Sequence, residues 1–297
     1  MHALIDHLLL GADANGEPSV QSLRLANRHG LIAGATGTGK TVTLQRLAEQ
    51  FSDAGVAVFA ADIKGDLCGL GAAGSPQGKI AERIASMPWL DHRPQAYPVT
   101  LWDVHGRSGH PLRTTLSEMG PLLLGNLLQL TDSQQSALFA AFKVADREGL
   151  LLLDLKDLKA LLAHLKAEPQ MLGEDSALFT AASSQALLRR LATLEKQGAE
   201  ALFGEPALQL EDILQPAPDG RGVIHLLDAS TLVHEAPKVY ATFLLWLLAE
   251  LFEQLPERGD ADRPVLALFF DEAHLLFGDT PKALQERLVQ VVRLIRS

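Results

Sequence analysis

The residues of this sequence whose types suit chemistry begin with the stretch GATGTGKTV, residues 34–42. Glycines allow the backbone to bend so that successive N–H groups face one concave point. Lys40 adds a point charge, and Thr41 adds a hydroxyl suited to a divalent cation. A helical pattern follows at once, and the N-terminus of a helix also attracts anions. The stretch therefore predicts a loop that binds the phosphates of a nucleotide, formed by Gly34, Ala35, Thr36, Gly37, Thr38, Gly39, Lys40, Thr41 and Val42.

Two acids far along the chain complete this hypothesis. Asp271 and Glu272 end a very apolar run, LALFFDE. Because Mg²⁺ prefers oxygen ligands, we expect Thr41 and Asp271 to share a metal ion. Glu272 is then placed to orient and deprotonate the attacking water, so Glu272 and Lys40 are the candidate catalytic residues. An adjacent glutamate favours an ATP hydrolase over a small-molecule kinase or a GTPase, which makes ATP and Mg²⁺ the expected cofactors.

The same acids open the tetrapeptide DEAH, residues 271–274, which invites comparison with the DEAH-box RNA helicases. The spacing argues against that class, because more than two hundred residues separate Lys40 from Asp271. A long helical segment fills the interval. His274 either couples to the site or is an ordinary residue of a first helical turn, and the sequence leaves both readings open.

The first half of the sequence predicts the elements that position the loop. Residues 7–26 favour a β-hairpin, with Asn15-Gly16 as its turn. The run HGLIAGA, residues 29–35, is typical of a buried strand. Helical spacing follows from Thr41 and ends at Gly55, and the apolar run 56–63 predicts a second buried, parallel strand. Strand, helix and strand in this order indicate a βαβ unit.

The rest of the chain alternates between strand and helix patterns. We expect a helix near 79–87 and a third strand at 97–106, followed by nearly continuous helical periodicity from 120 to 203. Strand character returns at 222–230 and 264–274, and helices are expected at 239–255 and from Pro281 to the end. The predicted fold class is α/β: a P-loop NTPase with a mainly parallel sheet, an N-terminal hairpin and an all-helical insert. We expect a single domain over 1–297, with the insert at 120–203.

The composition excludes some classes of function. The formal net charge is −10 and the pI is about 5.4, which argues against a protein that coats DNA or an anionic membrane by bulk charge. A single cysteine, Cys68, allows no internal disulfide and fits a reducing compartment. The N-terminus lacks the pattern of a signal peptide. The apolar run 239–255 is short for a bilayer span and carries two glutamates, so we expect a cytoplasmic protein without a membrane partner.

Five segments together resemble the bacterial HerA-like ATPases of the YjgR type, within the HerA–FtsK group of P-loop ATPases. They are NRHGLIAGATGTGKT, VFAADIKGDL, GHPLRTTLSEMGPLLL, QGAEALFGEP and LALFFDEAHLLF. By this resemblance, Lys40 and Thr41 match the Walker A pair, and Asp271 and Glu272 match the Walker B acid and the catalytic glutamate. Asp62 and Lys64 fall where the group often carries polar residues close to the nucleotide, although a simple turn with a hydrated acid also explains them.

The resemblance also implies an assembly. Members of the group usually work as ring hexamers in which a neighbour supplies an arginine, so a homo-oligomer is expected. Arg293 and Arg296 are candidates for that arginine, and a helix-surface role is the alternative for both. Members continue past RLIRS into a strand with a polar sensor residue, so this chain resembles a C-terminally truncated member, and hydrolysis is less firmly expected than nucleotide binding.

Two functions remain open on the sequence. The first is a helicase-like motor that couples Mg·ATP hydrolysis to conformational work, with DNA as a candidate partner. The second is a nucleotide-dependent switch or scaffold that hydrolyses ATP slowly and binds a protein through its helical insert. Basic residues form only weak clusters, at Arg189-Arg190 and at Lys79 with Arg83, and so do not decide between them.

Overall fold

The structure is a computed structural model that describes residues 6–13, 15–75, 77–87, 93–254 and 261–273, together with residues 286 and 289. Two strands form an antiparallel hairpin, and five form a parallel sheet. The strands are β1 (His7–Ala12), β2 (Pro18–Ser22), β3 (Ala57–Asp62), β4 (Val99–Asp103), β5 (His110–Pro111), β6 (Ile224–Asp228) and β7 (Leu266–Phe270). The α-helices are α1 (Lys40–Asp53), α2 (Lys79–Ala85), α3 (Leu116–Leu127), α4 (Asp132–Glu148), α5 (Leu155–Ala167), α6 (Ala181–Lys196), α7 (Leu210–Leu214), α8 (Ser230–Glu235) and α9 (Pro237–Gln254).

The parallel sheet has the strand order β5-β4-β6-β3-β7. Its central strands β3 and β6 are almost wholly buried, as expected for strands that helices cover on both faces. The α/β fold class, the mainly parallel sheet and the N-terminal hairpin are therefore confirmed. Because all five strands run the same way, their carboxyl ends lie along one edge of the sheet.

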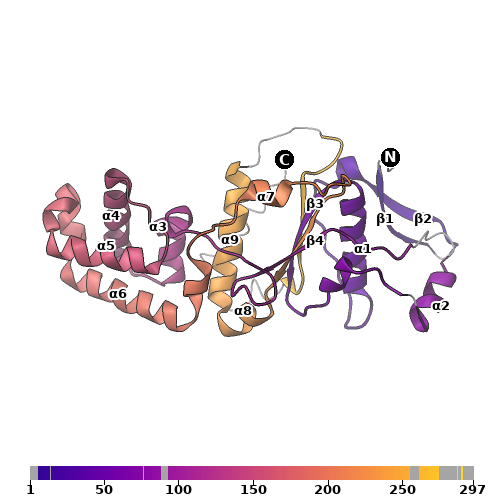
Figure 1. Ribbon diagram of the computed structural model, residues 1–297, viewed down its shortest axis with the longest axis horizontal. Coiled ribbons are helices and arrows are strands. Elements are labelled where there is room, and N and C mark those ends of the chain that lie inside the picture. The colour runs from indigo at the N-terminus through magenta and orange to yellow at the C-terminus, as the bar shows by residue number, and fades with distance from the viewer. Residues whose placement is uncertain are drawn as a thin grey trace.

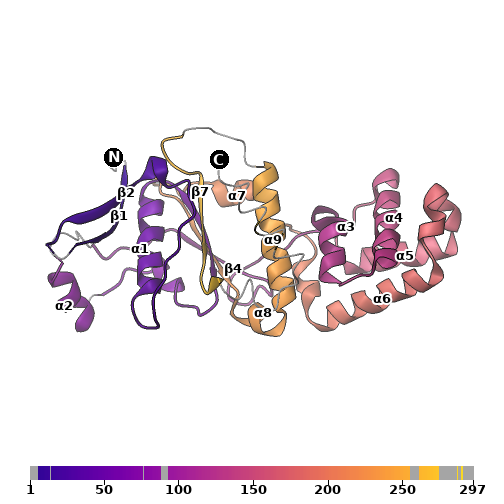
Figure 2. The same cartoon turned by 180° about the vertical axis from the view of Figure 1, so that it is seen from behind.

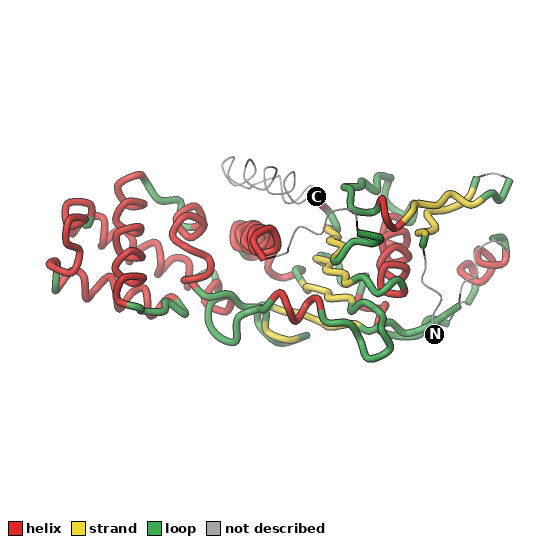
Figure 3. The backbone as a smooth tube through the Cα atoms, turned by 90° about the horizontal axis from the view of Figure 1, so that it is seen from above, coloured by secondary structure: helices red, strands yellow, loops and turns green. Residues whose placement is uncertain are grey.

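The elements stack along the long axis of the molecule (Figures 1 and 3). The helical segment from α3 to α6 lies at one end, α9 follows, then the sheet, then α1, and the β1–β2 hairpin and α2 lie at the other end. The reverse view shows the same order, with β7 at the side of the sheet nearest the viewer (Figure 2). The helix α9 therefore separates the sheet from the helical segment.

Two apolar clusters hold this stack together. The smaller cluster joins α1, through Leu44 and Phe51, to the hairpin and to one face of the sheet. The larger cluster runs from the other face of the sheet through α9 into the helices α3 to α6. Among the described helices, none combines the length and the apolarity that crossing a bilayer requires.

Local sequence signals explain where key helices begin and end. The helix α1 follows Gly39, which has the left-handed φ of 97°, and ends just before Gly55 at φ 74°. The helix α3 begins with a reciprocal cap: Thr115 Oγ1 accepts from the Glu118 amide, and Glu118 Oε2 accepts from the Thr115 amide, both at 3.1 Å. Such caps satisfy backbone groups that the first turn leaves unpaired.

One predicted strand is wrong. Residues 29–35 form no strand in the structure, and Leu31 is 87% exposed rather than buried. Only Ile32 packs against the cluster around α1. A strand requires a neighbouring backbone with which to form hydrogen bonds. Within the described residues no strand pairs with residues 29–35, and β7 is the edge strand of the sheet. An apolar run in the sequence cannot reveal whether such a partner is present.

Several expectations lie outside the described residues. They are the roles of His274, Arg293 and Arg296 and most of the helix expected from Pro281 to the end of the chain, of which only residues 286 and 289 are described, both as helix. The division into a single domain with an insert at 120–203 remains a prediction. The helices α3 to α7 follow β5 and precede β6 in the chain.

Candidate functional site

The glycine-rich loop adopts a tight turn ahead of α1. Thr38 lies across the turn, where its Oγ1 donates to the Ala35 carbonyl at 2.7 Å. A Cβ atom at Gly34 would come within 2.5 Å of that same Oγ1, so a larger residue at this position would force the Thr38 side chain out of its bond to Ala35. Gly37 and Gly39 have positive φ values of 79° and 97°, which other residues rarely adopt. The glycines are thus required by the geometry of the loop.

The N-terminus of α1 offers hydrogen-bond donors at this loop. No side chain caps the helix, and no acidic residue lies in its first turn. The first backbone amides of a helix have no partner within the helix, and they carry its partial positive charge. The Lys40 ammonium folds over the same turn and donates to the carbonyls of Gly34 at 2.9 Å and Ala35 at 3.1 Å. Lys40 and the free amides therefore converge on the loop.

A row of aspartates runs along the carboxyl edge of the sheet. Asp103, Asp228 and Asp62 end β4, β6 and β3, and the strand register places Asp228 beside both of the others. Asp271 follows β7, whose last residue pairs with the residue before Asp62. The row thus has the order Asp103, Asp228, Asp62 and Asp271. Sequence reasoning named Asp62 and Asp271 but missed Asp103 and Asp228, although each of these also ends a largely apolar run.

Three of these carboxylates are used to build turns. Asp62 is buried and accepts backbone amides of the following loop at both oxygens. Its donors are Lys64 at 3.2 Å and Gly65 at 2.8 Å on Oδ1, and Leu67 at 2.9 Å on Oδ2. Asp62 therefore organises the loop after β3, the role that the sequence left open as a turn.

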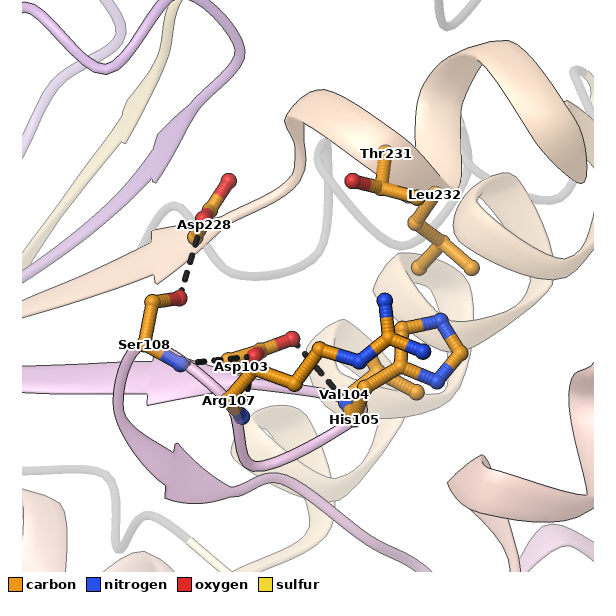
Figure 4. Close-up of a pocket in the computed structure, with 8 residues that line it drawn as sticks. All are labelled: Asp103, Val104, His105, Arg107, Ser108, Asp228, Thr231 and Leu232. Carbon is orange, nitrogen blue, oxygen red and sulfur yellow. Dashed lines mark hydrogen bonds between the residues drawn. The ribbon is translucent and has the colours of Figure 1, made fainter.

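Asp103 and Asp228 frame a cavity of about 200 Å³ beyond β4 and β6 (Figure 4). Burial opposes ionisation of Asp103, yet the backbone amides of the loop that follows it hold its pKa below the usual value. These donors are His105, Arg107 and Ser108. Asp228 accepts from the Ser108 hydroxyl at 3.0 Å and from the Ser230 hydroxyl at 2.6 Å. The carboxylates of Asp103 and Asp228 are thus both hydrogen-bonded to residues of the loops around the cavity.

Asp271 differs from the other three. Its Oδ1 accepts the Glu272 amide at 3.0 Å, and its second oxygen has no hydrogen bond within the described part of the chain. Burial raises the pKa of Asp271, and the negative charges of Glu272 and Asp62 raise it further, whereas Lys64 lowers it. Asp271 is therefore the strand-end carboxylate with an oxygen open to a cation.

Glu272 is held in an unusual backbone conformation beside Asp271. Its φ of 47° lies in the left-handed region, where residues other than glycine are uncommon and often functional. The ammonium of Lys64 forms an ion pair with Glu272 Oε1. This hydrogen bond, and then the charge of Glu272, raise the pKa of Lys64. The loop after β3, whose turn Asp62 stabilises, therefore places the Lys64 ammonium against the Glu272 carboxylate.

The same loop connects this pair of acids to α1. Gln45, in the second turn of α1, donates from Nε2 to the Asp66 carbonyl at 2.8 Å. Lys64, two residues earlier in that loop, contacts Glu272. The N-terminal half of α1 and the end of β7 thus border one loop at one edge of the sheet. No hydrogen bond joins Thr41 to Asp271 among the residues described, so their shared metal remains a prediction. Sequence reasoning missed Gln45, because a half-buried glutamine on a helix carries no signal of its own.

One protein family and several solved structures resemble this chain. The model of the family described as "Helicase HerA-like C-terminal" matches residues 7–297. A comparison with curated protein sequences found no match.

Solved structures share the fold. VirB4 of Thermoanaerobacter pseudethanolicus is 16% identical with a TM-score of 0.53, over 97% of this chain and 74% of that one. The bacterial conjugative coupling protein TrwBdeltaN70, in its unbound monoclinic form, is 15% identical with a TM-score of 0.50, over 96% of this chain and 71% of that one. Its trigonal form in complex with sulphate is 12% identical with a TM-score of 0.50, over 99% and 76%. At such identities the likeness concerns the fold alone. The family match spans nearly the whole chain, and the chain therefore belongs to the helicase HerA-like C-terminal family.

Proposed function

We propose that this chain binds Mg·ATP between the glycine-rich loop and the end of β7, and hydrolyses it to drive a conformational change. One observation carries the proposal. Of the four aspartates along the sheet edge, Asp271 alone keeps an oxygen without a hydrogen bond in the described part of the chain, and it adjoins Glu272. The other three are occupied in turns. A family of helicase-like proteins supports the same reading.

The residues present fit the cofactor. The amides at the start of α1 have no side-chain cap, and Gly34 itself adds no side chain to the loop. Gly34 to Val42 would hold the phosphates, with Lys40 against the β- and γ-phosphates. The Thr41 hydroxyl and the Asp271 carboxylate would hold Mg²⁺, an ion that takes oxygen ligands and neutralises phosphate charge.

Glu272 has the role of general base in this proposal. A carboxylate has two oxygens, and either can accept a proton from a water molecule within hydrogen-bond reach. The ion pair with Lys64 engages Oε1 of Glu272. Lys64 is therefore a positioning residue that orients the carboxylate of the base. In a homo-oligomer, a neighbouring copy would complete the site, and DNA is the proposed track of the motor.

The experiment separates binding from turnover. Titration with a fluorescent ATP analogue and Mg²⁺ measures binding, and phosphate release measures hydrolysis. We expect Lys40→Ala to abolish binding, because the phosphates lose their point charge. We expect Glu272→Gln to retain binding and to stop turnover, because an amide cannot accept the proton.

Matched controls are available on exposed helix surface. Lys238→Ala and Glu253→Gln make the same changes on α9 and should alter neither measurement. Undiminished turnover in Glu272→Gln would remove Glu272 from the role of base. Normal nucleotide binding in Lys40→Ala would refute the site itself.

A further inference from the structure

A hydrogen bond joins the helix that follows the glycine-rich loop to the loop that carries Lys64. The Gln45 side chain, half-buried in the second turn of α1, donates from Nε2 to the main-chain carbonyl of Asp66 at 2.8 Å. The helix α1 packs against β3 and β7, the two strands whose ends carry the candidate site. Gln45 thus holds this loop from the same helix that begins at Lys40.

The loop after β3 has an anchored base and an exposed tip. The buried Asp62 carboxylate accepts the amides of Lys64, Gly65 and Leu67. Leu67 is buried, whereas residues 64–66 are exposed. These three residues, Lys-Gly-Asp, include no apolar side chain. Hydrogen bonds rather than apolar packing therefore set the position of the tip.

The ion pair at this tip is too exposed to fix the loop by itself. The side chains of Lys64 and Glu272 are 51% and 24% exposed. Exposed ion pairs contribute little net stability, because ordering a long side chain costs entropy and water screens the charges. The pair therefore depends on a loop backbone that already presents Lys64 to Glu272. Asp62 holds that backbone from the strand, and Gln45 holds it from the helix.

Glu272 depends on such support more than an ordinary strand residue does. The parallel pairing of β7 with β3 ends at Phe270, before Glu272 is reached. The left-handed φ of 47° also turns the chain away from the direction of the strand. Backbone pairing thus leaves the carboxylate of Glu272 unoriented, and its ion pair with Lys64 supplies the orientation.

We propose that Gln45 is a positioning residue that acts on Glu272 through the Asp66 carbonyl and Lys64. The inference rests on the proposed ATPase and adds a residue to its mechanism. Lys40 and Gln45 lie five residues apart on one helix, so α1 carries both the phosphate-binding lysine and the donor that holds the loop. The path from Gln45 to Glu272 therefore sets the position of the base relative to the phosphates.

The test is a cycle of single and double substitutions, with phosphate release and binding of the ATP analogue measured in parallel. Gln45→Met removes the donor and nearly keeps the length and shape of the side chain. We expect turnover to fall about 10-fold or more, with nucleotide binding unchanged, because the base is displaced while the phosphate loop stays intact. In the Lys64→Met background, Gln45→Met should cause no further loss, since both residues act along one path.

The matched control is Gln185→Met, the same change at an exposed position of α6, which should alter neither turnover nor binding. Turnover at the wild-type rate in Gln45→Met would remove Gln45 from the reaction. Losses that multiply in the double variant would show that Gln45 acts independently of Lys64, and they too would overturn the proposal.

A cysteine in the same loop gives a second readout that needs no turnover. Cys68 is the single cysteine of the chain and is exposed, and its Sγ donates to the Gly65 carbonyl at 3.1 Å. Loosening of the loop in Gln45→Met should raise the rate at which a maleimide modifies Cys68, whereas Gln185→Met should keep the wild-type rate. An unchanged rate in Gln45→Met would overturn the role of its hydrogen bond. A wild-type chain that releases no phosphate would instead refute the proposed ATPase, so the two failures are distinguishable.

Discussion

At the scale of single residues, hydrogen bonding distinguishes aspartates that look alike in the sequence. Asp62 and Asp103 end parallel strands, and their carboxylates accept hydrogen bonds from the backbone amides of the loops that follow. Asp271 occupies the equivalent place on β7 and accepts only the Glu272 amide among the described residues. Its environment combines burial, two neighbouring negative charges and one cation, Lys64. The balance of these effects sets the pH at which Asp271 ionises.

The first prediction concerns Lys64. In the proposed site, Mg²⁺ requires the ionised form of Asp271, so Mg-dependent nucleotide binding should weaken as the pH falls through the pKa of that carboxyl. Lys64 lowers this pKa, and its removal in Lys64→Met should raise it. We therefore expect the acidic limb of Mg-dependent ATP-analogue binding to move to higher pH. Lys64→Arg keeps the charge and should leave the limb in place; a limb unchanged in Lys64→Met would show that Lys64 does not act on the site.

At the scale of elements, a buried histidine joins two strands of the sheet to the short helix α7. His225 on β6 accepts from the Trp102 indole of β4 at 3.1 Å through Nδ1, and its Nε2 lies 3.0 Å from the Ile213 carbonyl of α7. These bonds require a neutral ring with the proton on Nε2. The Trp102 and His225 rings also stack, with centroids 6.0 Å apart. Burial lowers the pKa of His225 to about 4.

The second prediction follows from this pKa. Below pH 6.5 the unfolded chain binds a proton at His225 that the folded chain excludes until about pH 4. Folding stability should therefore fall as the pH drops through this window, by at most about 3 kcal/mol. Urea unfolding from pH 7 to pH 4 measures the effect. His225→Gln retains an acceptor and a donor but does not titrate, so its pH dependence should be flatter; an identical slope in both proteins would contradict the assignment.

At the scale of the whole molecule, α9 joins parts that would otherwise be separate. It covers one face of the sheet and packs against α3 on its other side, within one continuous apolar cluster (Figure 3). Leu116 of α3 is fully buried in that cluster. A shared core makes the unfolding of one part costly for the other.

The third prediction is therefore a single unfolding transition. Loss of nucleotide-analogue fluorescence, which reports the sheet edge, should coincide on heating with loss of far-ultraviolet circular dichroism, to which the helical segment contributes most. Leu116→Ala should destabilise the protein by about 2–5 kcal/mol through the cavity it leaves. Both signals should move down together in this variant. Two separated transitions, or a shift of the dichroism signal alone, would show that the helical segment unfolds independently.

The sequence by itself determined the features that depend on local chemistry. A glycine at a turn, a glycine at the end of a helix and an unbroken apolar run are each set by residues that are neighbours in the sequence. For this reason the hairpin, α1, β3 and the helices from α3 to α6 could be predicted. The tight turn of the glycine-rich loop belongs to the same class, since the glycines that it requires lie within nine neighbouring residues, whereas its binding of phosphate stays a prediction.

The tertiary structure alone decided the features that depend on partners distant in the chain. Residues 29–35 have the composition of a strand but form no ladder, because a strand exists only where another backbone pairs with it. The ion pair of Lys64 with Glu272 and the bond from Gln45 to Asp66 join segments that no pattern connects. Hydrogen bonds and charges act through space, and only the folded chain brings these groups together.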